Sequence, residues 1–177
     1  MPTERDLDVA FASKMAEAPE FVACILSHTK FHEYASRVRV LHSEQARARP
    51  HVETRLWWKE WWCEVPEFGK RSASTMFIAF ERADTKRRFA LHVENKTATG
   101  RLTSTQAESY EVRARCMMND KAYLNHTDFT TVLIAPRMFG RNNWAKCASF
   151  DCYIPYDKIA KFIPAFEDWA GAIRLVE

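Results

Sequence analysis

An acid and a base stand two residues apart at the end of an apolar run, at Glu94 and Lys96. The run at residues 89–93 is typical of a buried strand, and side chains of a strand alternate between its two faces. Glu94 and Lys96 should therefore point to one face, and Asn95 to the other. A carboxylate and an ammonium group cost free energy at the end of a buried strand unless they are paired or used. Two interpretations follow: an ion pair at a sheet edge, or a metal-binding acid beside a catalytic cation.

The strand that carries Glu94 is expected to be the second arm of a β-hairpin. Residues 74–81 have the pattern of another strand, and the polar segment 82–86 is short enough for an antiparallel turn. Symmetric pairing about this turn places Thr75 opposite Glu94. Opposed residues share a face, with Cβ atoms about 5 Å apart. An acid at position 75 would complete a two-carboxylate site of the kind that Mg²⁺ prefers.

A helix is expected soon after the hairpin, at about residues 105–117, because apolar side chains recur there at helical spacing. Gln106 and Tyr110 are four residues apart and so share one face of this helix, and Arg113 lies about one turn further along. The amide of Gln106 and the hydroxyl of Tyr110 could orient a phosphate or a metal-bound water. The alternative is that Tyr110 only packs against the sheet and Gln106 only faces solvent.

Together these features resemble the PD-(D/E)XK nuclease superfamily, and the spacing of Gln106 and Tyr110 resembles its RecB-like branch. The resemblance implies an α/β fold, a restriction-endonuclease-like αβα sandwich with a mixed central sheet and, in this chain, extra N-terminal helices. It implies a nuclease, a hydrolase that cuts phosphodiester bonds with the help of Mg²⁺ or Mn²⁺. The partner would then be nucleic acid, DNA more than RNA, and a homodimer is left open.

The resemblance also implies a role for each matching residue. Glu94 and the backbone carbonyl of Asn95 would bind the metal ion. Lys96 would position the attacking water or stabilise the transition state. Gln106 and Tyr110 would support the site and the bound phosphate.

The chain departs from the family pattern on the first strand of the hairpin. Thr75 stands where the family has an aspartate, and Ala73 stands where a glutamate often precedes it. Thr75 can still touch a metal ion through its hydroxyl, but it brings no charge, so most of the affinity for Mg²⁺ would be lost. Acids of the preceding segment are candidates for the missing ligand, namely Glu53, Glu60 and Glu64.

Three functions are therefore open. The first is a metal-dependent nuclease, impaired by the loss of the aspartate. The second is a catalytically inactive protein of the same fold that binds nucleic acid or a protein partner. Arg101 and Arg113 would then contact phosphates, and further arginines would add to them, namely Arg71, Arg87, Arg88 and Arg115. The third is an interaction domain built around a cluster of tryptophans.

Length and composition are those of an ordinary globular domain. The 177 residues include 47% hydrophobic and 28% charged side chains, with a net charge of +3 that permits an anionic partner. We expect one domain over residues 1–177, with a helical part at about 1–50 and a core at about 51–177. The five cysteines are an odd number without a Cys-x-x-Cys pair, so small buried thiols are expected rather than disulfides or a zinc site. No apolar run reaches the length of a membrane span and the N-terminus does not resemble a signal peptide, which predicts a soluble cytoplasmic protein.

The remaining elements are predicted from periodicity and from helix-breaking residues. Residues 56–63 hold four tryptophans in two pairs spaced four apart, which favours a helix with one wide aromatic face; an aromatic-rich strand is the alternative. We interpret these rings as core or interface, with an exposed row that stacks on bases as the alternative. Helices are expected at 6–17, from Pro19 onward and at 155–173, the last with Pro164 as a candidate interruption. Strands are expected at 37–41, 129–136 and 149–154, and a polar loop at 139–148.

Overall fold

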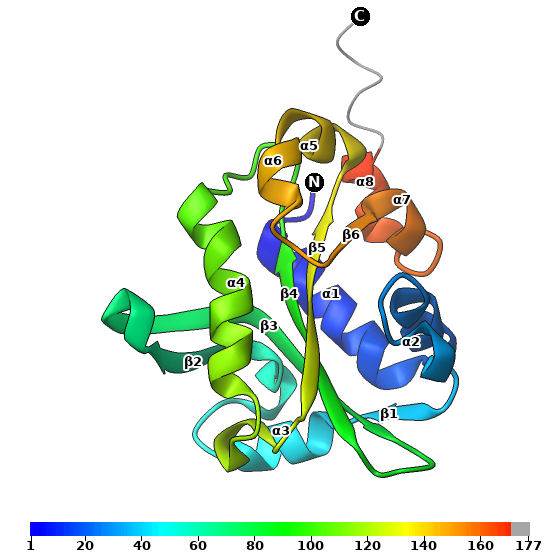
Figure 1. Cartoon of the computed structure of the whole chain (residues 1–177). Helices are drawn as coiled ribbons and strands as arrows, with labels where there is room; N and C mark the ends of the chain where they lie inside the picture. Colours follow the sequence, from blue (N-terminus) through cyan, green and yellow to red (C-terminus); the bar gives the residue numbers. More distant parts are fainter. Residues whose placement is uncertain (171–177) are drawn as a thin grey trace, which may run out of the picture.

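The computed structural model describes residues 1–170, which form a mixed α/β structure around a curled central sheet (Figure 1). The strands are β1 (Val38–Val40), β2 (Lys59–Val65), β3 (Lys70–Arg82), β4 (Arg88–Asn95), β5 (Asp128–Ala135) and β6 (Cys152–Pro155). Across the sheet the order is β1-β3-β4-β5-β6, and β2 also pairs with β3. Strand β3 is antiparallel to its neighbours, whereas β4, β5 and β6 run parallel. The sheet is mixed, as predicted.

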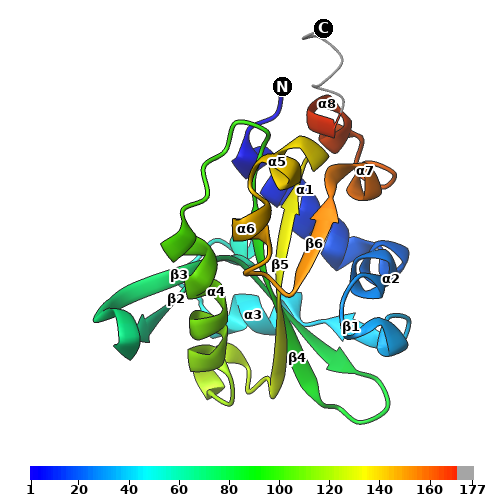
Figure 2. The same cartoon turned by 45° about the horizontal axis from the view of Figure 1, so that its top comes forward.

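Helices lie on both faces of this sheet. They are α1 (Glu4–Glu17), α2 (Pro19–Ser27), α3 (His42–Ala48), α4 (Ser104–Met117), α5 (Arg137–Asn142), α6 (Trp144–Cys147), α7 (Tyr156–Ile159) and α8 (Glu167–Ala170). Helix α1 crosses one face and α4 the other (Figures 1 and 2). Thr3 caps α1 in a reciprocal pair of hydrogen bonds with Asp6, and Pro19 occupies the first turn of α2, where its missing N–H is not needed.

The alternation of side chains along β3 and β4 separates the two cores. Ile78 and Leu91 belong to the core beneath α1 and α2, whereas Phe77 and Ala90 belong to the core beneath the end of α4. Each strand is therefore apolar on both faces, which explains its continuous hydrophobic sequence. Glu94 follows directly in such a strand, so its burial comes from the same two-sided packing.

The tryptophan segment is a strand, and the prediction of a helix there is wrong. Trp61 pairs with Ser74 of β3, and burial alternates along β2 as the pleat requires. Trp61 is buried, whereas Trp62 is 49% exposed. Trp57 and Trp58 are also buried, but they precede the strand and enter the other core. The spacing of four arose from two separate pairs of rings rather than from one helical face.

One further prediction fails near the C-terminus, and a second is met in its interrupted form. Residues 139–148, expected as a polar loop, contain most of α5 and all of α6, because Phe139 and Cys147 pack into the core beside α4. The segment expected to be helical at 155–173, with Pro164 as its candidate interruption, forms α7, a 3₁₀ turn that starts at Pro164, and α8; its last part falls outside the described residues. Proline lacks the N–H that a continuous helix would need there.

The cysteines and the helix lengths can be compared with what the composition predicted. All five cysteines are free thiols, three of them buried. Among residues 1–170, none of the helices combines the length and apolar character needed to cross a membrane.

Candidate functional site

The hairpin brings Thr75 and Glu94 together in the predicted register. Met76 pairs with Val93, so the next position along places residue 75 beside residue 94. The hydroxyl of Thr75 donates a hydrogen bond to Oε2 of Glu94 over 2.8 Å. The position expected to hold an acid therefore holds a neutral donor that contacts the carboxylate directly.

A break in the alternation of β3 puts Ser74 on the same face of the sheet as its neighbour Thr75. Ser74 contacts His92 on the α4 face over 2.7 Å, and Phe77 packs on the same face, although the two are three residues apart. Strict alternation would put them on opposite faces. The backbone N–H of Thr75 points toward the hydroxyl of Tyr110, 3.4 Å away. Such irregularities in a strand re-aim side chains and are common beside functional sites.

The carboxylate of Glu94 is surrounded by four donors and is only 1% exposed. Its Oε2 accepts hydrogen bonds from the hydroxyls of Thr75 and Tyr110. Its Oε1 accepts one from the amide of Gln106 over 3.2 Å and lies 2.5 Å from the ammonium nitrogen of Lys96. Because a carboxylate offers about four acceptor positions, all of them are engaged.

Lys96 lies between two carboxylates. Its Nζ is 2.5 Å from Oε1 of Glu94 and 3.3 Å from Oε1 of Glu4, which reaches the site from the first turn of α1. Burial acts to lower the pKa of Lys96, but the two carboxylates outweigh it, so the pKa is raised above its usual value. Lys96 is therefore a fixed cation here.

Asn95 faces the opposite side of the sheet, as the alternation predicts. Its side-chain amide donates to Oδ1 of Asp8 over 2.7 Å, and its carbonyl oxygen accepts from the hydroxyl of Tyr156 over 2.5 Å. Burial raises the pKa of Asp8 to about 7, against the opposing effect of the hydrogen bond from Asn95. The strand end is thus held from both faces, by α4 on one side and by α1 and α7 on the other.

Tyr110 and Arg113 extend the site along α4. Burial, followed by the charge of Glu94, raises the pKa of Tyr110 well above its usual value, so its hydroxyl keeps its proton and acts as a donor. The guanidinium of Arg113 lies 4.1 Å from the ring centre of Tyr110. Its Nη1 donates to Ser72 over 2.9 Å and to Ser109 over 2.7 Å, whereas its buried Nε has no partner in the described chain.

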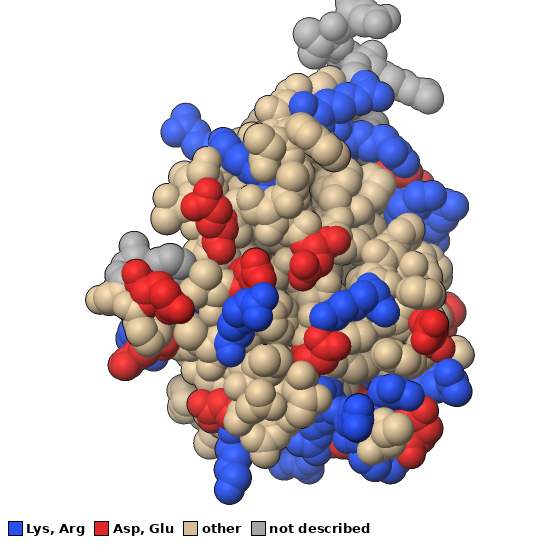
Figure 3. Space-filling model, viewed as in Figure 1, with Lys and Arg blue, Asp and Glu red and all other residues tan. Residues whose placement is uncertain are grey.

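A groove of about 460 Å³ opens between α4 and β3 beside this network. Hydroxyl groups dominate its walls. The lining residues are Ser72, Ala73, Thr75, Thr103, Thr105, Gln106, Ser109, Tyr110 and Arg113. Basic and acidic side chains are interspersed over the face of the molecule that carries α4 (Figure 3). Any ligand of this site would be held mainly within the groove rather than by a broad charged surface.

The donor set does not fit a divalent cation as it stands. Magnesium requires free carboxylate oxygens, but both oxygens of Glu94 accept hydrogen bonds and an ammonium group already lies against one of them. Among the described residues, no three His, Cys, Asp or Glu side chains cluster as metal ligands would. Glu4, the other acid that contacts Lys96, is linked to Glu94 through that ammonium group.

The predicted site residues are placed as follows. Glu94, Lys96, Gln106, Tyr110 and Thr75 come together in one network, and Asn95 adjoins it through the backbone. Arg101 is exposed before α4, whereas Arg113 is only 3% exposed. The candidate acids of the preceding segment are elsewhere: Glu53 pairs with Arg55, Glu60 with Lys59, and Glu64 lies opposite Arg71 in the β2–β3 pair.

Sequence reasoning missed Glu4 and Asp8. They lie four residues apart and so share a face of α1, and Asp8 is buried next to the buried apolar residues Leu7 and Phe11. An acid next to buried apolar positions of a helix was the sequence feature that could have indicated a role for Asp8. Which strand end it meets depends on how α1 crosses the sheet, and helical periodicity does not specify that.

Comparisons with models of known protein families, with curated proteins and with solved structures find no match for this chain. The resemblance to the nuclease superfamily therefore stays a prediction from the sequence motifs.

Proposed function

We propose that this chain binds nucleic acid in the groove beside Glu94 without hydrolysing it, as a catalytically inactive relative of the PD-(D/E)XK nucleases. The observation that carries the proposal is the engagement of Glu94. Four donors occupy its carboxylate, and one of them, Thr75, stands where the resemblance requires an acid. A site of this kind keeps the shape of the nuclease centre without the charge that would hold a metal ion.

The groove offers the groups that contact a phosphate backbone. Hydroxyls of Ser and Thr and the N–H groups at a helix start are common phosphate contacts. Thr103 and Thr105 flank the start of α4 and line the groove together with the guanidinium of Arg113. Exposed Arg101 lies two residues before Thr103 and would add a cationic contact at the entrance.

Binding and cleavage are measured together with labelled single-stranded and double-stranded DNA and RNA. We expect fluorescence anisotropy to show binding that weakens with salt, because phosphate contacts release counterions. We expect no cleavage with Mg²⁺ or Mn²⁺. Cleavage that disappears in Glu94→Ala would overturn the proposal in favour of the metal-dependent nuclease.

A matched pair of variants tests the location of the binding site. Thr105→Glu adds a negative charge to the groove and should weaken binding. Thr127→Glu adds the same charge on the exposed segment before β5, where the backbone N–H of Thr127 donates to the carbonyl oxygen of Arg88. This control variant should bind nucleic acid as tightly as the parent chain does. Equal effects of the two substitutions would place binding outside the groove.

A further inference from the structure

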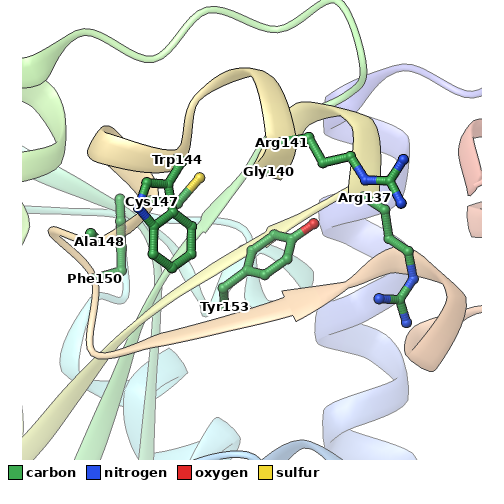
Figure 4. A pocket seen from close by; sticks show the side chains of 8 residues that line it. All are labelled: Arg137, Gly140, Arg141, Trp144, Cys147, Ala148, Phe150 and Tyr153. Carbon is green, nitrogen blue, oxygen red and sulfur yellow. The ribbon is translucent and has the colours of Figure 1, made fainter.

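A second and larger cavity lies beside α5 and α6 (Figure 4). Its volume of ≈ 570 Å³ falls within the range of about 300–1,000 Å³ that is usual for small-molecule sites. Three aromatic rings line it, from Trp144, Phe150 and Tyr153. Two arginines, Arg137 and Arg141, complete the wall. The cavity thus combines flat apolar surfaces with cations.

Trp144 is the most informative of the aromatic residues, because its side chain is 75% exposed. Large apolar side chains exposed next to a cavity commonly mark a binding site. Trp144 belongs to the short helix α6, whose Cys147 is buried in the core, so its backbone is anchored while its ring faces solvent. The indole therefore offers a prepared stacking surface.

The floor of the cavity is fixed by close packing. The hydroxyl of Tyr153 donates to the carbonyl oxygens of Ala135 and Pro136 over 3.1 Å and 3.0 Å. A Cβ atom at Gly140 would lie 2.9 Å from this hydroxyl, which is too close for any other residue without movement. Glycine inside a helix costs about 1 kcal/mol relative to alanine. The close approach of α5 to the ring of Tyr153 explains why a glycine occupies position 140.

The two arginines provide positive charge at one end of the cavity. Figure 4 shows both guanidinium groups at the end away from Trp144, with the ring of Tyr153 between. Arg141 is exposed and makes no ion pair with the described residues. Arg137 pairs with Asp157 over 2.8 Å, but both side chains are substantially exposed, and such surface pairs are weak and readily exchanged.

We propose that this cavity binds a nucleotide, with the base stacked on Trp144 and the phosphate held by Arg141 and Arg137. Stacking suits any base because each presents a flat π face. Guanidinium groups match the geometry of phosphate oxygens and can bind them in pairs. The spacing of the two features, with a fixed ring between them, matches a ligand that is aromatic at one end and doubly anionic at the other. This proposal does not depend on the groove beside Glu94.

Calorimetric titration with adenosine 5′-monophosphate tests the proposal, and the same titration with inorganic phosphate tests the contribution of the base. We expect the nucleotide to bind more tightly than phosphate. Trp144→Ala should weaken nucleotide binding by about 5- to 150-fold, the effect of losing one base–aromatic stack. Arg141→Gln should weaken nucleotide and phosphate alike. Trp62→Ala removes another exposed indole, on β2, and should change neither.

A second titration, with a 5′-phosphorylated oligonucleotide, distinguishes a free nucleotide from the end of a strand. Oligonucleotide binding that requires the 5′-phosphate and weakens in Trp144→Ala, without binding of the free nucleotide, would assign the cavity to a strand end. If Trp144→Ala changes the binding of neither ligand, or if phosphate binds as tightly as the nucleotide, the proposal is wrong. Thr105→Glu in the groove should leave nucleotide binding unchanged, so the failure of either proposal can be recognised separately.

Discussion

Thr75→Asp tests whether the missing charge at this position is what distinguishes the site from a metal centre. The substitution removes the hydroxyl that donates to Glu94 over 2.8 Å, and a hydrogen bond to a charged group contributes about 1.5–3 kcal/mol. It also places a second carboxylate beside the first. Two like charges about 4 Å apart repel by about 4 kcal/mol at an effective dielectric constant of about 20. We therefore expect a loss of about 5.5–7 kcal/mol in the free energy of unfolding at pH 8.

Urea denaturation measures this loss, with and without Mg²⁺. A divalent cation that binds only the folded variant stabilises it by about 2.7 kcal/mol at a concentration 100 times its Kd. We expect Mg²⁺ to stabilise Thr75→Asp and to leave the parent chain unchanged. Thr75→Asn is the matched control, because its amide can still donate to Glu94 and it adds no charge. It should lose little stability and show no response to Mg²⁺.

The reasoning is refuted if Thr75→Asp and Thr75→Asn are equally stable at pH 8 and neither responds to Mg²⁺. In that case the charge at position 75 would not be coupled to Glu94. The same variant, alone or with Ala73→Glu, can be incubated with DNA and Mg²⁺. Cleavage by the variant but not by the parent would show that the acid was the missing component.

Three further predictions concern the residues around the two sites. The pKa of the Asp8 carboxyl group is about 7 in the folded protein, against a usual value of 3.8. The folded protein therefore holds the Asp8 proton more tightly than the unfolded chain does. The stability that this proton contributes is full below pH 3.8 and is lost as the pH rises through 7. Asp8→Asn keeps the acceptor for Asn95 and should add up to about 4 kcal/mol at pH 8 and little at pH 4 in urea denaturation; an equal effect at both pH values would contradict this. Gln106→Leu removes a donor to Glu94 and should cost about 1–3 kcal/mol, whereas Gln106→Glu should cost more because it places a like charge there; the reverse order in urea denaturation would show that charge does not dominate. Gly140→Ala places a Cβ against the hydroxyl of Tyr153 and should lower the unfolding free energy by about 1–3 kcal/mol, despite the better helix propensity of alanine, and a gain in stability would show that α5 can move.

The sequence predicted well those elements whose position depends on local pattern. The hairpin register follows from the position of its turn, and it correctly brought Thr75 to Glu94. The spacing of Gln106 and Tyr110 follows from helical geometry, and both side chains reach the same carboxylate. The tryptophan segment was predicted wrongly because two adjacent pairs of rings mimic a helical repeat, while the pairing with β3 that makes it a strand is non-local.

What the pattern could not give is the number of donors around Glu94, and this number decides how the site is interpreted. A motif lists residues that can bind a metal ion, but a carboxylate is available as a ligand only if its oxygens are free. Lys96 also contacts Glu4, whose helix begins 92 residues earlier in the chain. That contact draws the ammonium group toward a second acid and keeps it against Glu94 on one side of the carboxylate. Removing it with Glu4→Gln should lower the pKa of Lys96, since one of the two carboxylates that raise it is lost. NMR titration of the Lys96 ammonium measures this shift, and an unchanged pKa would show that Glu94 alone holds the lysine.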